Sequence, residues 1–144
     1  MPEISTKFYK QCIKSLKLAY SELNKSNRED DIYGVFRAAC IKEFEIILEQ
    51  SGKLLRKLLK SYYSSPKTAY DLTFKDIFRA AHKFNLINEK QTEKWLEYRD
   101  NRNITSHDYG EMLADKALEI IPEFISDAEI LEEIFTKKFN TNET

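Results

Sequence analysis

Glycine and proline are scarce in this sequence, and their scarcity limits the folds that it can adopt. The chain has 144 residues but only 3 Gly and 3 Pro. Sheet-rich and loop-rich folds need many tight turns, which depend on these two residue types. The sequence therefore favours long helices. Its length suits one domain with a core of its own.

Apolar residues recur at helical spacing in five segments, which predicts five helices. These helices span about residues 5–24, 30–62, 73–84, 89–103 and 106–136. The third is short, and brief loops join all five. Because short connections favour antiparallel neighbours, we expect an all-α, up-and-down antiparallel four-helix bundle with one extra short helix. Residues 1–136 would form this single domain, and residues 137–144 a polar, frayed C-terminal tail.

The apolar stripes also predict the core, including both cysteines, which are expected to be reduced. In the first helix, the predicted inward residues are Phe8, Cys12, Leu16, Ala19 and Leu23. In the second helix, they include Val35, Phe36, Cys40, Phe44, Leu54, Leu58 and Tyr62. In the later helices, they include Phe74, Ile77, Phe78, Ala81, Trp95, Phe124 and Phe135.

Local signals predict where helices begin, end or bend. Residues 64–72 are expected to form a connecting loop that Pro66 interrupts. Thr73 heads a segment that resembles a capping box and opens the short third helix. Pro122 falls inside the last predicted helix and should kink or split it, and Gly52 allows a slight bend in the second.

Charge and composition exclude several classes of function. The formal net charge is −1, so no overall basic field draws the chain to nucleic acid or to a membrane. The basic segment "KLLRKLLK" (53–60) resembles a membrane-surface helix, but its leucines continue a core stripe, which favours a solvated outer face. The Tyr62-Tyr63 pair and His82 are expected to pack or to lie at the surface rather than to form a site. No signal segment, membrane span or metal-binding Cys/His spacing occurs, so a cytoplasmic protein without metal or cofactor is expected.

The strongest functional candidate is the junction between the fourth and last predicted helices. Trp95 is expected in the core, and Arg102, seven residues later, lies on the same face of the helix. His107 follows five residues after Arg102 and would point roughly 140° away on a continuous helix. A helix break at 103–106 would instead let the two side chains converge.

These residue types suit phosphodiester chemistry. His107 can act as a general acid or base, and Arg102 can hold a phosphate through two hydrogen bonds. Tyr109 can donate a hydrogen bond to the same phosphate, and RNA supplies its own 2′-OH as nucleophile, so neither metal nor cofactor is needed. Supporting roles fall to Asn103, Ser106 and Arg99. A buried arginine that binds helix carbonyls and a histidine that caps a helix remain alternatives.

The order of these residues resembles a known family. "RNITSHDY" (102–109) resembles the R-x4-H-x-Y signature of the HEPN superfamily. Together with "FRAAHKFNLI" (78–87) and Trp95, it is similar to the small HepT-type proteins, which are substrate-binding partners of minimal nucleotidyltransferases. Asp108 departs from the family, in which threonine is common at this position.

The resemblance implies a HEPN-like bundle that forms a homodimer, with a cleft between the subunits. It also implies a cognate minimal nucleotidyltransferase as partner. HepT-like proteins are toxins of toxin–antitoxin pairs that cleave RNA without metal, and the partner neutralises them by AMPylating the motif tyrosine. By position, Arg102 and His107 would be catalytic and Tyr109 would be modified.

The alternative is a non-catalytic subunit that binds a substrate or nucleotide for the partner. The chain lacks a Gly-Ser…Asp-x-Asp signature, so we do not expect it to transfer nucleotides itself.

Overall fold

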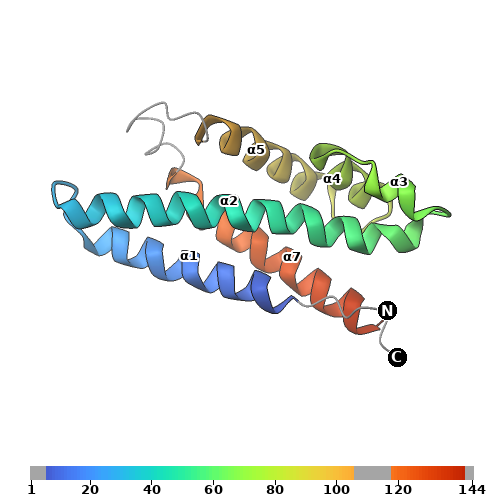
Figure 1. The fold of residues 1–144 in the computed structure, drawn as a ribbon, viewed down its shortest axis with the longest axis horizontal. Helices are drawn as coiled ribbons and strands as arrows, with labels where there is room; N and C mark the ends of the chain where they lie inside the picture. The colour runs from blue at the N-terminus through green and yellow to red at the C-terminus, as the bar shows by residue number, and fades with distance from the viewer. Residues whose placement is uncertain (1–5, 106–117, 142–144) are drawn as a thin grey trace.

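The computed structural model describes residues 6–105 and 118–141, with side chains described for 6–101 and 118–139. Four long helices form the bundle: α1 (Lys7–Lys25), α2 (Asp31–Leu59), α5 (Glu89–Thr105) and α7 (Ile121–Thr141). Three short elements, η1 (Lys60–Tyr62), α3 (Pro66–Tyr70) and α4 (Phe74–Lys83), connect α2 to α5. The long helices alternate in direction along the chain, which confirms the all-α, up-and-down bundle (Figure 1).

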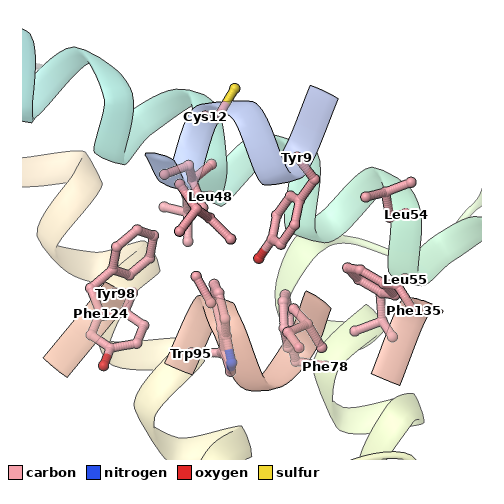
Figure 2. Close-up of a cluster of buried hydrophobic side chains, with 14 of the residues drawn as sticks. Tyr9, Cys12, Leu48, Leu54, Leu55, Phe78, Trp95, Tyr98, Phe124 and Phe135 are labelled. Atoms are coloured by element: carbon pink, nitrogen blue, oxygen red, sulfur yellow. The ribbon is translucent and has the colours of Figure 1, made fainter. Parts of the chain in front are cut away.

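The longest helix, α2, packs against α1, α4, α5 and α7 and is the centre of the fold. An aromatic cluster joins these helices in the core (Figure 2). Phe78 of α4 stacks on Trp95 of α5, with ring centres 5.1 Å apart and planes at 15°. Phe124 of α7 meets the rings of Trp95 and Tyr98 edge-to-face, at 5.6 and 4.9 Å. Burial of large aromatic side chains is a main stabilising contribution in a domain of this size.

The buried face of α1 differs from the prediction by one residue. Phe8 is 54% exposed, and the next residue, Tyr9, is buried in its place. The hydroxyl of Tyr9 lies 2.8 Å from Ser51 Oγ, which itself donates to the Ile47 carbonyl at 2.7 Å. Tyr9 is therefore the donor to Ser51. The spacing to Cys12 is compatible with either residue, and this hydrogen bond explains why Tyr9 takes the inward position.

Three other predictions about the core have mixed outcomes. Val35, predicted inward, is 63% exposed, so the prediction was wrong for this residue. Phe44 and Trp95 are buried as predicted, and Phe36 is partly buried against the core. Both cysteines, Cys12 and Cys40, are free and buried, and burial raises the pKa of the Cys40 thiol to about 11.

The connection at 64–72 was expected to be a loop, but it contains the helix α3. Pro66 stands in the first turn of α3, where its missing N–H costs nothing. Ala69 is fully buried, which anchors this turn to the core. Thr73 caps α4 as predicted, since its hydroxyl accepts a hydrogen bond from the Asp76 N–H at 3.2 Å.

The last helix is split near Pro122. Residues 118 and 119 are helical, residue 120 forms a turn, and α7 begins at Ile121 with Pro122 in its first turn. The predicted tail is in part helical, because α7 continues to Thr141. Phe139 extends the buried stripe there and stacks on Phe135, with ring centres 5.9 Å apart.

The two glycines of α2 should respond differently to alanine. A Cβ at Gly52 would lie 2.9 Å from the Phe74 ring, whereas a Cβ at Gly34 would meet no atom of the described residues within 4 Å. Gly34→Ala should therefore raise the free energy of unfolding by about 0.5–1 kcal/mol through helix propensity. Gly52→Ala should lack this gain, because the methyl group displaces the ring. Urea denaturation of both variants measures the difference, and an equal gain would contradict it.

None of the helices in the described ranges is long and apolar enough to cross a membrane. The leucines of segment 53–60 are buried, so this helix turns its apolar face to the core. Both findings agree with the solvated outer face that was predicted for "KLLRKLLK".

Candidate functional site

The structure places the first part of the predicted motif on α5. Arg102 and Asn103 belong to the last turns of this helix, which runs to Thr105. The predicted break at 103–106 is therefore wrong for residues 103–105, which are helical. Intrahelical hydrogen bonds are satisfied most simply by continuing the helix where no Gly or Pro interrupts it.

The other predicted site residues lie outside the described part of the chain. These are Ser106, His107, Asp108 and Tyr109, in the segment 106–117. Their roles, and the convergence of Arg102 with His107, stay predictions. The described residues show how the helix that carries Arg102 is held.

Arg99, predicted as a second cation for phosphate, already has partners in the structure. Its Nη1 lies 3.1 Å from Glu49 Oε1 of α2. Its guanidinium carbon lies 5.0 Å from the centre of the Phe74 ring, a cation–π distance. The ring in turn covers Gly52. These contacts indicate that Arg99 ties α5 to α2 and α4, one turn before Arg102.

Two further ion pairs hold α5 on its other sides. Lys75 Nζ of α4 lies 2.8 Å from Asp100 Oδ1. Lys94 Nζ lies 2.7 Å from Glu123 Oε1 of α7. Exposed ion pairs of this kind contribute only about 0–1 kcal/mol each to stability. They still restrict how α5 can shift along its neighbours.

Tyr98 anchors α5 from inside the bundle, one helical turn before Arg102. Tyr98 is 2% exposed, and its hydroxyl donates a hydrogen bond to the Asp127 carboxylate of α7. Burial, with the nearby carboxylate, raises the pKa of Tyr98 above its usual value, so the hydroxyl remains a donor at neutral pH. The last turns of α5 are thus fixed by the core as well as by surface pairs.

Removing the Tyr98 hydroxyl should destabilise the protein measurably. Tyr98→Phe leaves the Asp127 carboxylate without this donor, so we expect a loss of about 1–2 kcal/mol in the free energy of unfolding. Asp127→Asn keeps an acceptor oxygen and should lose less. Urea denaturation at pH 7 compares the two, and a Tyr98→Phe variant as stable as wild type would argue against the anchor.

Sequence reasoning did not find these positioning partners. Asp127 follows Phe124 by three residues and precedes the buried Ala128. A carboxylate so close to an apolar stripe was the one sequence feature that could have indicated a buried hydrogen-bond partner. Glu49 gave no such signal, since its partner Arg99 is 50 residues away in the chain.

An open hollow of about 340 Å³ lies at the turn between α4 and α5, at the opposite end of α5 from Arg102. His82, Asn85 and Asn88 contribute to its lining, and His82 is exposed as predicted. Within the parts of the chain that are described, no three His, Cys, Asp or Glu side chains gather as a metal site would require. The hollow is also lined by Leu86, Ile87, Glu89 and Gln91, and it lies away from the predicted motif.

Comparisons with known proteins agree with the resemblance to HepT-type proteins. The sequence model of a family described as "Nucleotidyltransferase substrate binding protein like" matches residues 8–137. A Haemophilus influenzae protein named "Probable ribonuclease HepT" is 35% identical over 94 residues. The match covers 65% of this chain and 63% of the relative, so it spans less than two thirds of that protein's length.

Two solved structures share the fold. A Haemophilus influenzae protein, described as showing the fold of a substrate binding domain of a nucleotidyltransferase, superposes with a TM-score of 0.79 and 26% identity. The superposition covers 92% of this chain and 99% of that protein. A Thermus thermophilus protein superposes with a TM-score of 0.61 and 24% identity over 81% of this chain and 94% of its own, which supports the fold alone.

Proposed function

We propose a function from one premise: this chain belongs to the nucleotidyltransferase substrate binding protein like family. The proposed function is that of a HepT-like, metal-independent endoribonuclease, the toxin of a pair with a minimal nucleotidyltransferase. The observation that carries it is the R-x4-H-x-Y order of Arg102, His107 and Tyr109, in a chain 35% identical to a probable ribonuclease HepT over 94 residues.

The proposed reaction uses only groups that RNA and this chain supply. The 2′-oxygen attacks the adjacent phosphorus, and the bond from phosphorus to the 5′-oxygen breaks. His107 exchanges the protons, and Arg102 stabilises the negative charge that develops on the phosphoryl oxygens. In a homodimer cleft, two copies of the motif would supply two imidazoles, one as base and one as acid. The products are a 2′,3′-cyclic phosphate and a free 5′-hydroxyl.

The anchoring of α5 supports this proposal. Catalysis by positioned charges needs groups that are held in place before the reaction. Tyr98 and Arg99 tie the helix that carries Arg102 to α7 and α2. The backbone of α5 that carries Arg102 is therefore held against its neighbouring helices.

Incubation of the purified protein with a mixture of cellular RNAs, in the presence of EDTA, tests the proposal. We expect cleavage with 2′,3′-cyclic phosphate ends. A substrate with 2′-deoxyribose at the cleaved position should resist, because it lacks the nucleophile. If the RNA stays intact after prolonged incubation with the homodimer, the proposed ribonuclease activity is contradicted.

The second candidate is a non-catalytic subunit that binds a substrate or nucleotide for the nucleotidyltransferase. The family description and the structure that superposes at a TM-score of 0.79 favour it. Co-expression with the nucleotidyltransferase, followed by intact mass measurement, separates the two candidates. AMP added to Tyr109 would favour the toxin, whereas a stable unmodified complex that never cuts RNA would favour the binding subunit.

A further inference from the structure

One end of the bundle carries a concentration of positive charge that the proposed function does not use. Residues 51–70 contain five cations and no Asp or Glu, although the whole chain has a net charge of −1. We call these residues the basic end: Lys53, Arg56, Lys57, Lys60 and Lys67. They lie on the last turns of α2, at the start of η1 and on α3.

The lysines of the basic end face solvent. Lys53, Lys57 and Lys60 stand four and three residues apart, which places them on one side of the α2–η1 rod. All three are exposed, whereas the leucines between them are buried. Because the apolar side is used by the core, this segment has no free apolar face to insert into a membrane.

These three exposed lysines of the basic end carry charge that no described carboxylate neutralises. No ion pair joins Lys53, Lys57 or Lys60 to a carboxylate among the residues that the structure describes. Elsewhere in the bundle, Lys75 and Lys94 pair with acidic residues of neighbouring helices. The uncompensated charge predicts attraction for a polyanion.

Exposed aromatic rings accompany these cations. Tyr70 is 69% exposed, and the Arg56 guanidinium carbon lies 6.0 Å from the centre of its ring. Arg56 is held in place by a 2.7 Å hydrogen bond from Nη2 to the Leu72 carbonyl. Tyr62 is 36% exposed and rests on Phe84, with ring centres 5.1 Å apart. Rings held beside cations are the elements of surfaces that bind single-stranded nucleic acid.

We propose that the basic end binds single-stranded RNA, with phosphates on Lys53, Lys57 and Lys60 and a base stacked on Tyr70. The choice of RNA over DNA rests on the proposed function. The basic end and α3 lie at the opposite end of the bundle from the last turns of α5 (Figure 1). Arg102 stands 13 residues beyond the start of α5, about 20 Å along the helix axis. The basic end is therefore a second RNA contact, separate from the proposed cleavage site.

A second copy of this chain is the main competing occupant. The turn between α1 and α2 carries Glu29, Asp30 and Asp31, which could meet the basic end of another molecule. An acidic protein surface would form ion pairs with the lysines, but these ion pairs would not involve the exposed Tyr70 ring. We therefore favour RNA, and the test includes self-association as an outcome.

RNA binding is measured by fluorescence anisotropy with a labelled single-stranded RNA and His107→Ala protein, which prevents cleavage. The test variant combines Lys53→Gln, Lys57→Gln and Lys60→Gln. Loss of three phosphate contacts should weaken binding about 100-fold at 0.1 M salt and reduce the slope of log K against log salt by about 2. The matched control combines three exposed lysines from other surfaces, Lys14→Gln, Lys42→Gln and Lys138→Gln, and should change binding less than threefold.

The ring is tested separately by Tyr70→Leu. This variant should bind the RNA about tenfold more weakly, because one stacked base is lost. Its binding of inorganic polyphosphate, which has no bases, should not change. Equal losses for both probes would overturn the stacking role.

Equal weakening by the test and control variants would overturn the basic end as a site. So would self-association in analytical ultracentrifugation that the test variant abolishes while RNA binding persists. The three lysine substitutions can also be made in protein that retains His107. If this variant cleaves RNA with the same KM as the wild type, the proposal for the basic end is overturned, whereas the proposed ribonuclease activity is not affected. If the wild type binds RNA but never cuts it, and the test variant loses this binding, the basic end is supported as an RNA-binding site and the ribonuclease activity is rejected.

Discussion

If the proposed function holds, His107→Ala should lower the rate of RNA cleavage by at least about 100-fold while leaving the proposed homodimer intact. A positioned general acid or base typically contributes a factor of about 10²–10⁴ to a rate. Initial rates on a labelled RNA, with EDTA present, measure the effect, and size-exclusion chromatography checks the assembly. Arg102→Lys should also be slow, because an ammonium cannot hold a phosphate through two parallel hydrogen bonds.

The chain supplies its own control for this prediction. His82 is its one other histidine, and it lies exposed near the end of α4, away from the last turns of α5. His82→Ala should cleave at the wild-type rate. A His107→Ala protein that cleaves as fast as His82→Ala would falsify the catalytic assignment.

Trp95→Ala should cause the largest loss of stability of any single substitution in the bundle. Trp95 is 1% exposed and contacts the rings of Phe78, Tyr98 and Phe124. Truncating a buried tryptophan leaves a cavity and costs about 3–5 kcal/mol. Since domains of this kind have a total stability of about 5–15 kcal/mol, much of the margin would be lost. Urea denaturation followed by circular dichroism measures the change.

Leu18→Ala is the matched control, because Leu18 also lies on a long helix but is 65% exposed. Its free energy of unfolding should change by no more than about 0.5 kcal/mol. If Trp95→Ala were equally mild, the aromatic cluster would not be the main link between α4, α5 and α7.

The helices and most of the core could be predicted from the sequence, because apolar spacing follows directly from the helical repeat. The exact register could not. Phe8 and Tyr9 fit the stripe of α1 equally well, and they are distinguished by tertiary contacts such as the hydrogen bond from Tyr9 to Ser51, 42 residues away. Helix α3 was missed because a five-residue helix has too few positions to show a period.

The candidate site shows the same division between local and tertiary information. The order of Arg102, His107 and Tyr109 could be read directly, since a motif is a property of the chain. The partner of Arg99 could not, because Glu49 and Phe74 reach it only after α2, α4 and α5 have packed. The C-terminal extension of α7 was missed because Phe139 follows two lysines and precedes polar residues.

The placement of Phe74 has a consequence for substitutions far from the motif. The Phe74 ring packs against the backbone of Gly52, which has no side chain, and the Arg99 guanidinium lies over the ring. Any side chain introduced at position 52 would press on this ring, and the ring also contacts the arginine that precedes Arg102 by one turn. A change in the middle of α2 would thus reach the proposed reaction centre through a single phenyl group, without touching RNA or any residue of the signature.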